Sequence, residues 1–483
     1  MSESNVAKNT VFFISALVIQ KILAFGFFIF IARTAGGYNT GDYVGALSFA
    51  TLFSIFLDLG LSQVLIRETA KNREEGHNYL NNLLSLKMLL SVFVYLMIFI
   101  SISVLGLLGK SHPNTLMVLI AGVVMITDSF AMSFQSIFRG YQNLFYESFI
   151  IVLSKVLIII VGVVGVKLGF PPYIFIVAIL AGSVFGLVLS WYFLWKRHHF
   201  NFKFQLNKEV LRPFFVMAWP FAVLGLFSNV YAQIDVVILS VVQGSKAVGL
   251  YGVPSRTLNA LQFIPMAFSA SLYPAMSRYF VESKDKLQNV FERGFIYLAA
   301  ICVPIAVGIF LLAEPIIVTA YTSEYQGSVL ALKILAPSLI FAFLTFPVGA
   351  LLNACDKQKI NTINMGIIMV INIVLNLVLV PRFSFIGSAW AWFITNVVWF
   401  VLTIYWVSKL IDYSKKLLLI NFLKALFSAA AMGLVVLCFK DKIHIIINVG
   451  LGAAVYVVMM FLVKGFDMDE IKELVVSFKT PKL

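Results

Sequence analysis

The first long apolar stretch, residues 11–31, constrains the fold more than any other part of the chain. It reads VFFISALVIQKILAFGFFIFI, and its single charged residue is Lys21, at the centre. About 20 apolar residues are enough for a helix to cross the ~30 Å hydrocarbon core of a membrane. A lysine without a partner at that depth costs roughly 2.5–3.5 kcal/mol on insertion scales. We therefore expect a membrane-spanning helix whose Lys21 faces protein or a water-filled cavity, with the remaining spans as its walls.

The composition of the whole chain is that of a membrane protein. Of its 483 residues, 61% are hydrophobic and 12% are charged, whereas soluble domains are about 25% charged. We predict an all-α, polytopic fold of about fourteen transmembrane helices joined by short loops. The predicted spans are residues 11–31, 43–66, 80–108, 115–138, 145–166, 173–195, 213–242, 249–275, 294–313, 330–352, 360–380, 385–408, 417–438 and 443–463.

The basic residues fall unevenly on the two sides of this predicted membrane. Of 36 lysines and arginines, 24 lie on the side of the N-terminus, 8 on the other side and 4 within spans. Lysine and arginine accumulate in cytoplasmic loops, so we predict that both termini are cytoplasmic and that the chain resides in the cell membrane. The net charge of +14 then reflects topology, and we expect no nucleic-acid partner.

Two short motifs recur at a similar spacing, which indicates an internal repeat. GDY at 41–43 enters the second span and GLY at 249–251 enters the eighth, 208 residues later. The elbows RGYQN at 139–143 and NACDKQK at 353–359 lie about 215 residues apart. A six-helix unit used twice in one orientation gives two lobes related by an axis along the membrane normal. The predicted division is a first lobe at 1–196, a cytoplasmic linker at 197–212, a second lobe at 213–412, and two further helices with an interfacial tail at 413–483.

The linker and the tail are both amphipathic. The stretch KRHHFNFKFQLNKEVLR at 196–212, which contains the linker, is basic and alternates apolar with polar residues. This pattern predicts either a β-strand or, as we favour, a segment on the inner leaflet whose lysines face lipid phosphates. In the tail, DMDEIKELVVSF at 467–478 predicts a short interfacial helix, with a frayed tail as the alternative.

Three stretches resemble one known family. They are FLDLGLSQVLIRETAK at 56–71, AQIDVVILSVVQGSKAVGLYGVPSRTLNALQFIPMAFSASLYPAMSRY at 232–279, and LLNACDKQKINTINMGIIMVINIVLNLVLVPRFSFIGSAWA at 351–391. They are similar to the polysaccharide-transporter (Wzx-like) flippases of the MOP superfamily, relatives of the lipid II flippases and MATE exporters. The resemblance implies two six-helix lobes in a V, two additional helices, and alternating access. It also implies a cargo lipid that carries an oligosaccharide on a diphosphate, and basic residues in the first helices, where Lys21 occupies a matching place.

Four charged residues within spans predict the substrate site. Lys21, Asp128 and Lys155 each lie near the middle of a span, which predicts a cationic site where Asp128 tunes the lysines or exchanges partners between them. The alternative is a structural ion pair between Asp128 and one lysine, which leaves the other lysine unexplained. Arg256, in the eighth span, either binds phosphate with its planar guanidinium or extends outward to the membrane surface.

Five further residues are candidates for lining the cavity or coupling transport to an ion. They are Asp235, Asn361, Asn364, Arg33 and Asp58. Asp235 shares a helix face with Ser228 and Tyr231, and is either an ion-coupling carboxylate or a hydrogen-bonding hub. Asn361 and Asn364 begin an asparagine stripe, with Asn372 and Asn376, that either lines a sugar-facing cavity or packs helices together.

Two charged residues of the second and third spans favour structural interpretations. Asp58 is expected to cap or contact a neighbouring helix, with Gly60 permitting close approach. Lys87 lies near the inner end of its span and is expected to extend its ammonium group to the membrane surface.

These features rank three classes of function. We favour a flippase for a lipid-linked oligosaccharide. An ion-coupled exporter of cationic drugs would favour an acidic cavity, whereas the first lobe has two lysines to one aspartate within its central region. A membrane-embedded polysaccharide polymerase would need a charged outer loop with paired carboxylates, which the short outer loops do not provide. We expect no enzymatic activity, cofactor or metal, and a monomer that interacts with membrane lipids and with H⁺ or Na⁺ as a coupling ion.

Overall fold

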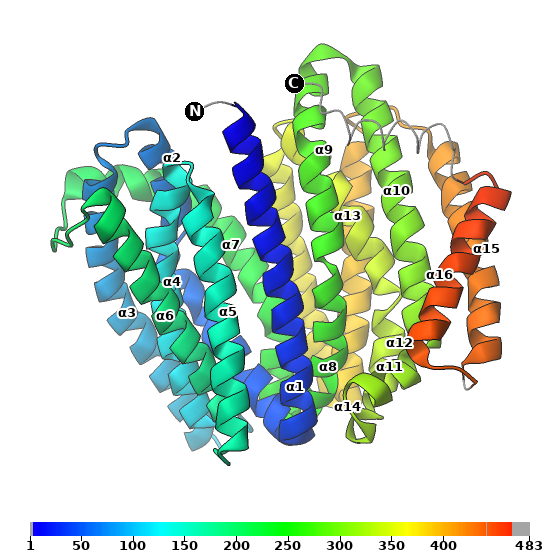
Figure 1. Cartoon of the computed structure of the whole chain (residues 1–483), viewed down its shortest axis with the longest axis horizontal. Coiled ribbons are helices and arrows are strands. Elements are labelled where there is room, and N and C mark those ends of the chain that lie inside the picture. Colours follow the sequence, from blue (N-terminus) through cyan, green and yellow to red (C-terminus); the bar gives the residue numbers. More distant parts are fainter. Residues whose placement is uncertain (1–2, 441, 466–483) are drawn as a thin grey trace. The chain divides into compact units, whose positions relative to one another are not determined.

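The computed structural model describes residues 3–440 and 442–465, and within these ranges it contains helices and no strands (Figure 1). A 3-10 turn, η1, covers Ser323–Tyr325. The α-helices are α1 Glu3–Asp58, α2 Leu61–Lys71, α3 Gly76–Leu107, α4 Thr115–Gly140, α5 Leu144–Lys167, α6 Ile174–His198, α7 Lys208–Gln243, α8 Ser245–Leu261, α9 Phe263–Glu282, α10 Lys284–Leu311, α11 Ala313–Ala320, α12 Ser328–Leu335, α13 Ser338–Ala354, α14 Gln358–Val407, α15 Lys415–Phe439 and α16 Ile445–Leu462. The all-α prediction is confirmed.

Eleven helical segments of the described chain are long and apolar enough to cross a membrane. Two of them are divided by a kink, α1 at Gly36 (φ 75°, ψ 171°) and α14 at Ser384 (φ 51°, ψ −137°). The positive φ suits Gly36, because glycine has no Cβ to clash, while Ser384 follows Pro381, which interrupts helical hydrogen bonding. If each half of α1 and α14 counts as a span, the described chain has thirteen such segments, consistent with the prediction of about fourteen.

The predicted span 43–66 is interrupted near its end. Leu59 and Gly60, between α1 and α2, both have positive φ, at 47° and 74°. A Cβ added at Gly60 would lie 2.7 Å from the Cβ of Phe221 and 3.0 Å from the carbonyl oxygen of Ala218. Gly60 therefore permits the close approach of α7, as expected from the sequence.

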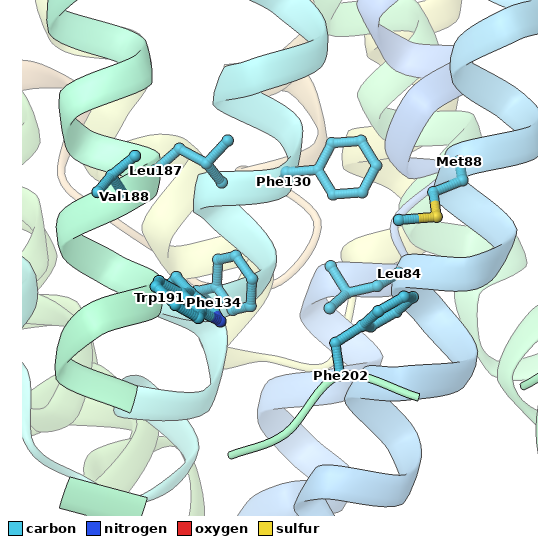
Figure 2. Close-up of a pocket in the computed structure, with 8 residues that line it drawn as sticks. All are labelled: Leu84, Met88, Phe130, Phe134, Leu187, Val188, Trp191 and Phe202. Atoms are coloured by element: carbon cyan, nitrogen blue, oxygen red, sulfur yellow. The ribbon is translucent and has the colours of Figure 1, made fainter. Parts of the chain in front are cut away.

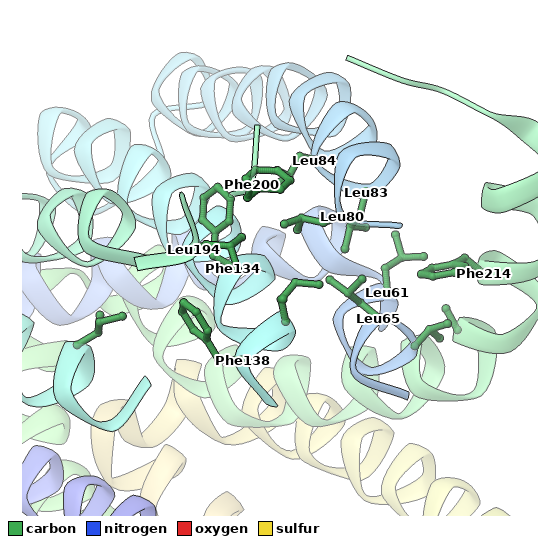
Figure 3. Close-up of a cluster of buried hydrophobic side chains, with 14 residues drawn as sticks. Leu61, Leu65, Leu80, Leu83, Leu84, Phe134, Phe138, Leu194, Phe200 and Phe214 are labelled. Carbon is green, nitrogen blue, oxygen red and sulfur yellow. The ribbon is translucent and has the colours of Figure 1, made fainter. Parts of the chain in front are cut away.

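Helices α2–α6 pack around a buried apolar core. Helix α4 contacts α1, α2, α3, α5 and α6. The core draws Leu61 and Leu65 from α2, Leu84 from α3 and Phe138 from α4 (Figure 3). It also contains Phe200, fully buried although it follows α6 in the linker.

The linker does not form the β-strand that its alternating pattern allowed. Residues 199–207 carry no regular hydrogen-bonded structure of their own. Instead, backbone N–H groups at every second residue donate to polar side chains of α3. The three bonds are Lys203 N to Asn81 Oδ1 (3.0 Å), Gln205 N to Ser85 Oγ (2.9 Å) and Asn207 N to Asn82 Oδ1 (2.6 Å). A helix surface thus replaces the missing partner strand.

The two recurring motifs contact each other. A Cβ at Gly41 would lie 1.7 Å from the Ser245 carbonyl oxygen, and one at Gly249 would lie 2.0 Å from the Gly37 carbonyl oxygen. Beside them, Asp42 accepts hydrogen bonds from the Ser245 hydroxyl and from the backbone N–H of Asn114 at 3.3 Å. The glycines that mark the repeat therefore serve the close packing of α1 against α8.

A second group of helices packs around α10. Helix α10 contacts α9, α13 and α15, and α15 contacts α16. The hydroxyl of Tyr456 on α16 donates to the Ala300 carbonyl oxygen of α10 at 2.8 Å. The Asn448 amide of α16 donates to the Val436 carbonyl oxygen of α15 at 3.0 Å. Polar groups buried in α16 are thus used to hold helices together.

The chain divides into two compact units. One comprises Met1–Ala260 with Met365–Ala391, and the other Leu261–Asn364 with Trp392–Leu483. The first unit therefore extends beyond the predicted lobe at 1–196. The predicted boundaries at 1–196, 197–212, 213–412 and 413–483, and the V arrangement, stay predictions. The tail helix proposed at 467–478 lies outside the described residues.

Candidate functional site

All four residues of the predicted substrate site lie in the first unit. Lys21 on α1 and Asp128 on α4 are exposed, while Lys155 on α5 and Arg256 on α8 are half-buried. Asp128 and Lys155 lie at the middle of their helices. Solvent-accessible charges at the middle of apolar, membrane-length helices are the arrangement expected of a hydrated cavity wall.

Lys155 is the centre of this group electrostatically. It interacts with the carboxylate of Asp128 and with the cationic groups of Lys21 and Arg256. Asp128 also accepts a hydrogen bond from the Ser183 side chain on α6. The structure thus brings the four predicted residues into one cluster of three positive charges and one negative charge. We call these four residues the cationic cluster.

Small residues on α6 allow the helices behind the cationic cluster to pack closely. A Cβ at Gly182 would lie 2.2 Å from Cγ1 of Ile158 and 3.0 Å from the carbonyl oxygen of Ser154 on α5. One at Gly186 would lie 2.9 Å from the Ser154 hydroxyl. The neighbouring Ser183 bonds to Asp128 on α4, so α6 contacts both helices that carry Asp128 and Lys155.

A buried carboxylate lies next to the cationic cluster. Asp235 on α7 is buried; it accepts hydrogen bonds from the Tyr251 hydroxyl of α8 and from the backbone N–H of Val236 at 2.7 Å. Arg256 interacts electrostatically with both Asp235 and Tyr43. Sequence reasoning missed Tyr251, although it is the last residue of the repeated motif at 249–251, which we used only for its spacing.

Asp58 forms an ion pair that does not involve the cationic cluster. Its Oδ1 lies 2.7 Å from Nζ of Lys87 on α3, which also donates to the carbonyl oxygen of Ser129 on α4 at 3.0 Å. Ser62 donates to Asp58 through its hydroxyl. The prediction that Lys87 extends to the membrane surface is wrong, because its side chain is fully buried and bonded to α1 and α4. The expected contact of Asp58 with a neighbouring helix is present.

The asparagine stripe of α14 divides into two environments. Asn361 donates to the Gly349 carbonyl oxygen at 3.2 Å and to Asn353 Oδ1 at 2.8 Å, both on α13. Asn364 is buried. Asn372 and Asn376 are fully buried, and the Asn376 amide donates to the Asn372 carbonyl oxygen at 2.9 Å.

Three of these asparagines retain unused hydrogen-bonding capacity. Within the described part of the chain, Asn364 Nδ2, Asn372 Nδ2 and Asn376 Oδ1 have no hydrogen-bond partner. These asparagines face packed protein, so a sugar-lining role for the stripe stays a prediction. Arg33, the remaining candidate, is exposed near the kink of α1.

The side chains that commonly ligate metals do not converge in the described chain. No group of three or more histidine, cysteine, aspartate or glutamate side chains could hold a metal ion there. What the cationic cluster offers is attraction and hydrogen bonding for an anionic ligand.

Comparison with known families gives two matches. Residues 6–280 match the family described as polysaccharide biosynthesis proteins, and residues 220–378 match the MatE family.

Individual relatives are distant in sequence but similar in length. An uncharacterized membrane protein of Methanocaldococcus jannaschii is 24% identical over 81% of this chain and 95% of its own. A probable low-salt glycan biosynthesis flippase of Haloferax volcanii is 19% identical over 80% of each chain. A solved structure of the lipid II flippase MurJ, in an inward closed conformation, has a TM-score of 0.76 at 17% identity, over 94% of this chain and 98% of that one. At that identity the likeness shows a shared fold.

Proposed function

Because this chain belongs to the polysaccharide biosynthesis protein family, we propose that it moves a lipid-linked oligosaccharide across the cell membrane by alternating access. The proposal starts from three points, namely the MOP superfamily fold, a multi-pass location in the membrane and a flippase function in the broad sense. The proposal adds the chemistry of the cargo, which is a polyprenyl diphosphate carrying a glycan. It also adds the residues that bind the diphosphate.

One observation carries the proposal, namely the excess of positive charge in the cationic cluster. Asp128 can neutralise only one of the three cations of the cationic cluster, so two positive charges remain for a ligand. A diphosphate that leaves the headgroup layer needs such partners at mid-depth. A cation about 4 Å from a phosphate oxygen contributes roughly 4 kcal/mol at an effective dielectric constant near 20, against about 1 kcal/mol in water. That difference is large enough to decide whether the cargo enters.

Binding and release follow from the same arrangement. In the absence of cargo, the Ser183 side chain bonds to Asp128, and the carboxylate of Asp128 attracts Lys155. An arriving diphosphate would compete with Asp128 for Lys155 while Lys21 and Arg256 supply further charge. Arg256 lies on α8, whose packing against α1 through Gly41 and Gly249 would have to open for release on the opposite side.

The coupling ion is proposed to act at Asp235. This carboxylate is buried, bonded to Tyr251 and electrostatically linked to Arg256. Binding of H⁺ or Na⁺ there would change the field at Arg256 and hence its attraction for phosphate. An exporter of cationic drugs, which the MatE match over 220–378 would allow, is disfavoured by the positive charge of the cationic cluster.

Substitution of Lys21 tests the proposed cargo site. In cells that lack the native gene, Lys21→Ala should abolish glycan transport while the amount of protein in the membrane, measured by immunoblot, stays unchanged. Lys21→Glu should be at least as damaging, and Lys21→Arg should retain partial function because it keeps the charge. Lys167→Ala is the matched control, since Lys167 is an exposed lysine at the end of α5, and should transport normally.

A double substitution distinguishes cargo binding from a structural role. If Lys21 served only to compensate Asp128, Lys21→Ala would lower protein abundance, and Lys21→Ala with Asp128→Ala would restore both abundance and transport. Transport by that double variant would refute the proposed site.

A further inference from the structure

An open apolar pocket lies on the surface of the first unit, and none of its lining residues belongs to the cationic cluster. It has a volume of about 260 Å³, and α3, α4, α6 and the linker line it through Leu84, Phe130, Val188, Trp191 and Phe202, among others (Figure 2). Every lining residue is hydrophobic. A cavity of this kind offers water no hydrogen-bond partners. On a membrane-spanning chain, the apolar groups available to occupy it are the acyl chains of lipids.

The linker provides one wall of the pocket in a fixed position. Figure 2 shows Phe202, on the extended segment, directed toward Leu84 of α3. The next residue, Lys203, is fixed by the bond from its backbone N–H to Asn81, and the bond from Gln205 to Ser85 continues the attachment. This wall of the pocket therefore belongs to a segment that hydrogen bonds hold in place. The pocket is thus not a transient gap between helices.

The same extended segment presents two different faces. Successive side chains of an extended chain point to opposite sides, so Phe202, Phe204 and Leu206 share one face and Lys203 lies on the other. The three apolar side chains are 40%, 59% and 41% exposed. Exposed aromatic and aliphatic side chains on one face with a lysine on the other match the boundary between acyl chains and headgroups.

Two exposed lysines, Lys196 and Lys203, lie close along the chain to residues that line the pocket. Lys196 is exposed near the end of α6, and its Nζ donates to the hydroxyl of Tyr192 at 3.2 Å, beside the pocket residue Trp191. Lys203 is exposed beside Phe202. The rings of Trp191 and Trp195 stack with centroids 6.5 Å apart, and tryptophan is enriched at the membrane interface. Apolar lining with a cationic rim is complementary to a lipid with an anionic headgroup.

We propose that this pocket binds one acyl chain of an anionic membrane phospholipid, with Lys203 and Lys196 attracting its phosphate. The site is separate from the proposed cargo site. Because the linker forms its wall, an occupied pocket would hold the linker against α3 and α6.

Lipid binding to the purified full-length chain can be counted by native mass spectrometry. We expect dioleoyl phosphatidylglycerol to bind more strongly than dioleoyl phosphatidylcholine. Val188→Trp, which fills the pocket, should weaken phosphatidylglycerol binding at least tenfold. The matched control is Val184→Trp, one helical turn earlier and also exposed but outside the pocket lining, and it should bind like the unsubstituted protein.

The headgroup part of the proposal is tested separately. Lys203→Gln and Lys196→Gln should each weaken phosphatidylglycerol binding about fivefold, as expected for one basic residue at an anionic surface, and should leave phosphatidylcholine binding unchanged. The control is Lys110→Gln, in the same unit between α3 and α4, which should have no effect.

Three results would overturn the proposal: equal binding of the two lipids, equal binding by the Val188 and Val184 variants, or displacement of phosphatidylglycerol by an equimolar polyprenyl phosphate. The last would assign the pocket to the cargo's own chain. If Val188→Trp does not fold, phosphatidylglycerol with a photoreactive acyl chain provides the test on unsubstituted protein. Cross-links should concentrate on peptides containing Met88 or Phe202, and an even spread over lipid-facing helices would contradict the site.

Discussion

Removing Asp58 should destabilise the chain more than removing Lys87, although the two form a single ion pair. The reason is their unequal burial, since the side chain of Lys87 is 0% exposed and that of Asp58 is 18% exposed. Without Asp58, the ammonium group stays buried with the Ser129 carbonyl oxygen at 3.0 Å and the hydroxyl of Ser62 at 3.4 Å. Without Lys87, the carboxylate keeps its bonds from Ser62 and its contact with solvent.

The expected magnitudes follow from this asymmetry. Removing one partner of a buried pair costs about 3–5 kcal/mol, which we expect for Asp58→Leu. Lys87→Met should lower the free energy of unfolding by about 1–3 kcal/mol. The cost is smaller because the Asp58 carboxylate still accepts hydrogen bonds from Ser62. Replacing both residues leaves no unpaired buried charge, so Asp58→Leu with Lys87→Met should be more stable than Asp58→Leu alone.

Thermal unfolding of the purified variants in one detergent measures these differences. At ~2–4 °C per kcal/mol, Asp58→Leu should lower the midpoint by roughly 6–20 °C, and the double variant should recover part of that loss. The reasoning would be refuted if Lys87→Met were the less stable single variant, or if the double variant were no better than Asp58→Leu.

Two further predictions concern topology and helix packing. A cysteine at exposed Lys110 should react with a membrane-impermeant thiol reagent in intact cells, whereas one at exposed Lys203 should react only after lysis. Labelling of position 203 in intact cells would contradict the predicted topology. Gly249→Ala should weaken the contact of α8 with α1, because the added Cβ would lie 2.0 Å from the Gly37 carbonyl oxygen. Overpacking of this kind costs about 1–3 kcal/mol of stability. An unchanged unfolding midpoint together with normal transport would contradict this prediction.

The sequence alone was sufficient to identify the all-α, multi-span fold, for a physical reason. The cost of placing polar groups in hydrocarbon acts on each segment separately, so apolar length marks the spans without knowledge of their neighbours. The same argument selected Lys21, Asp128, Lys155 and Arg256, because charges within spans are rare enough to be functional candidates. Gly60 was also interpreted correctly as a site of close helix approach, although the sequence placed it within a span and the structure places it between α1 and α2.

Pairing between helices depended on the tertiary structure. Periodicity defines the faces of a helix but not its rotation against a neighbour, so Lys87 could not be assigned to Asp58, 29 residues earlier in the chain. The partnership of Tyr251 with Asp235 was hidden for the same reason. The linker shows most clearly what the sequence could not decide. Its alternating pattern fits a β-strand, a segment on the inner leaflet, or the observed extended segment whose backbone N–H groups bond to side chains of α3. Only the packed helix, with Asn81, Ser85 and Asn82 in reach, decides where the backbone N–H groups of the linker find acceptors.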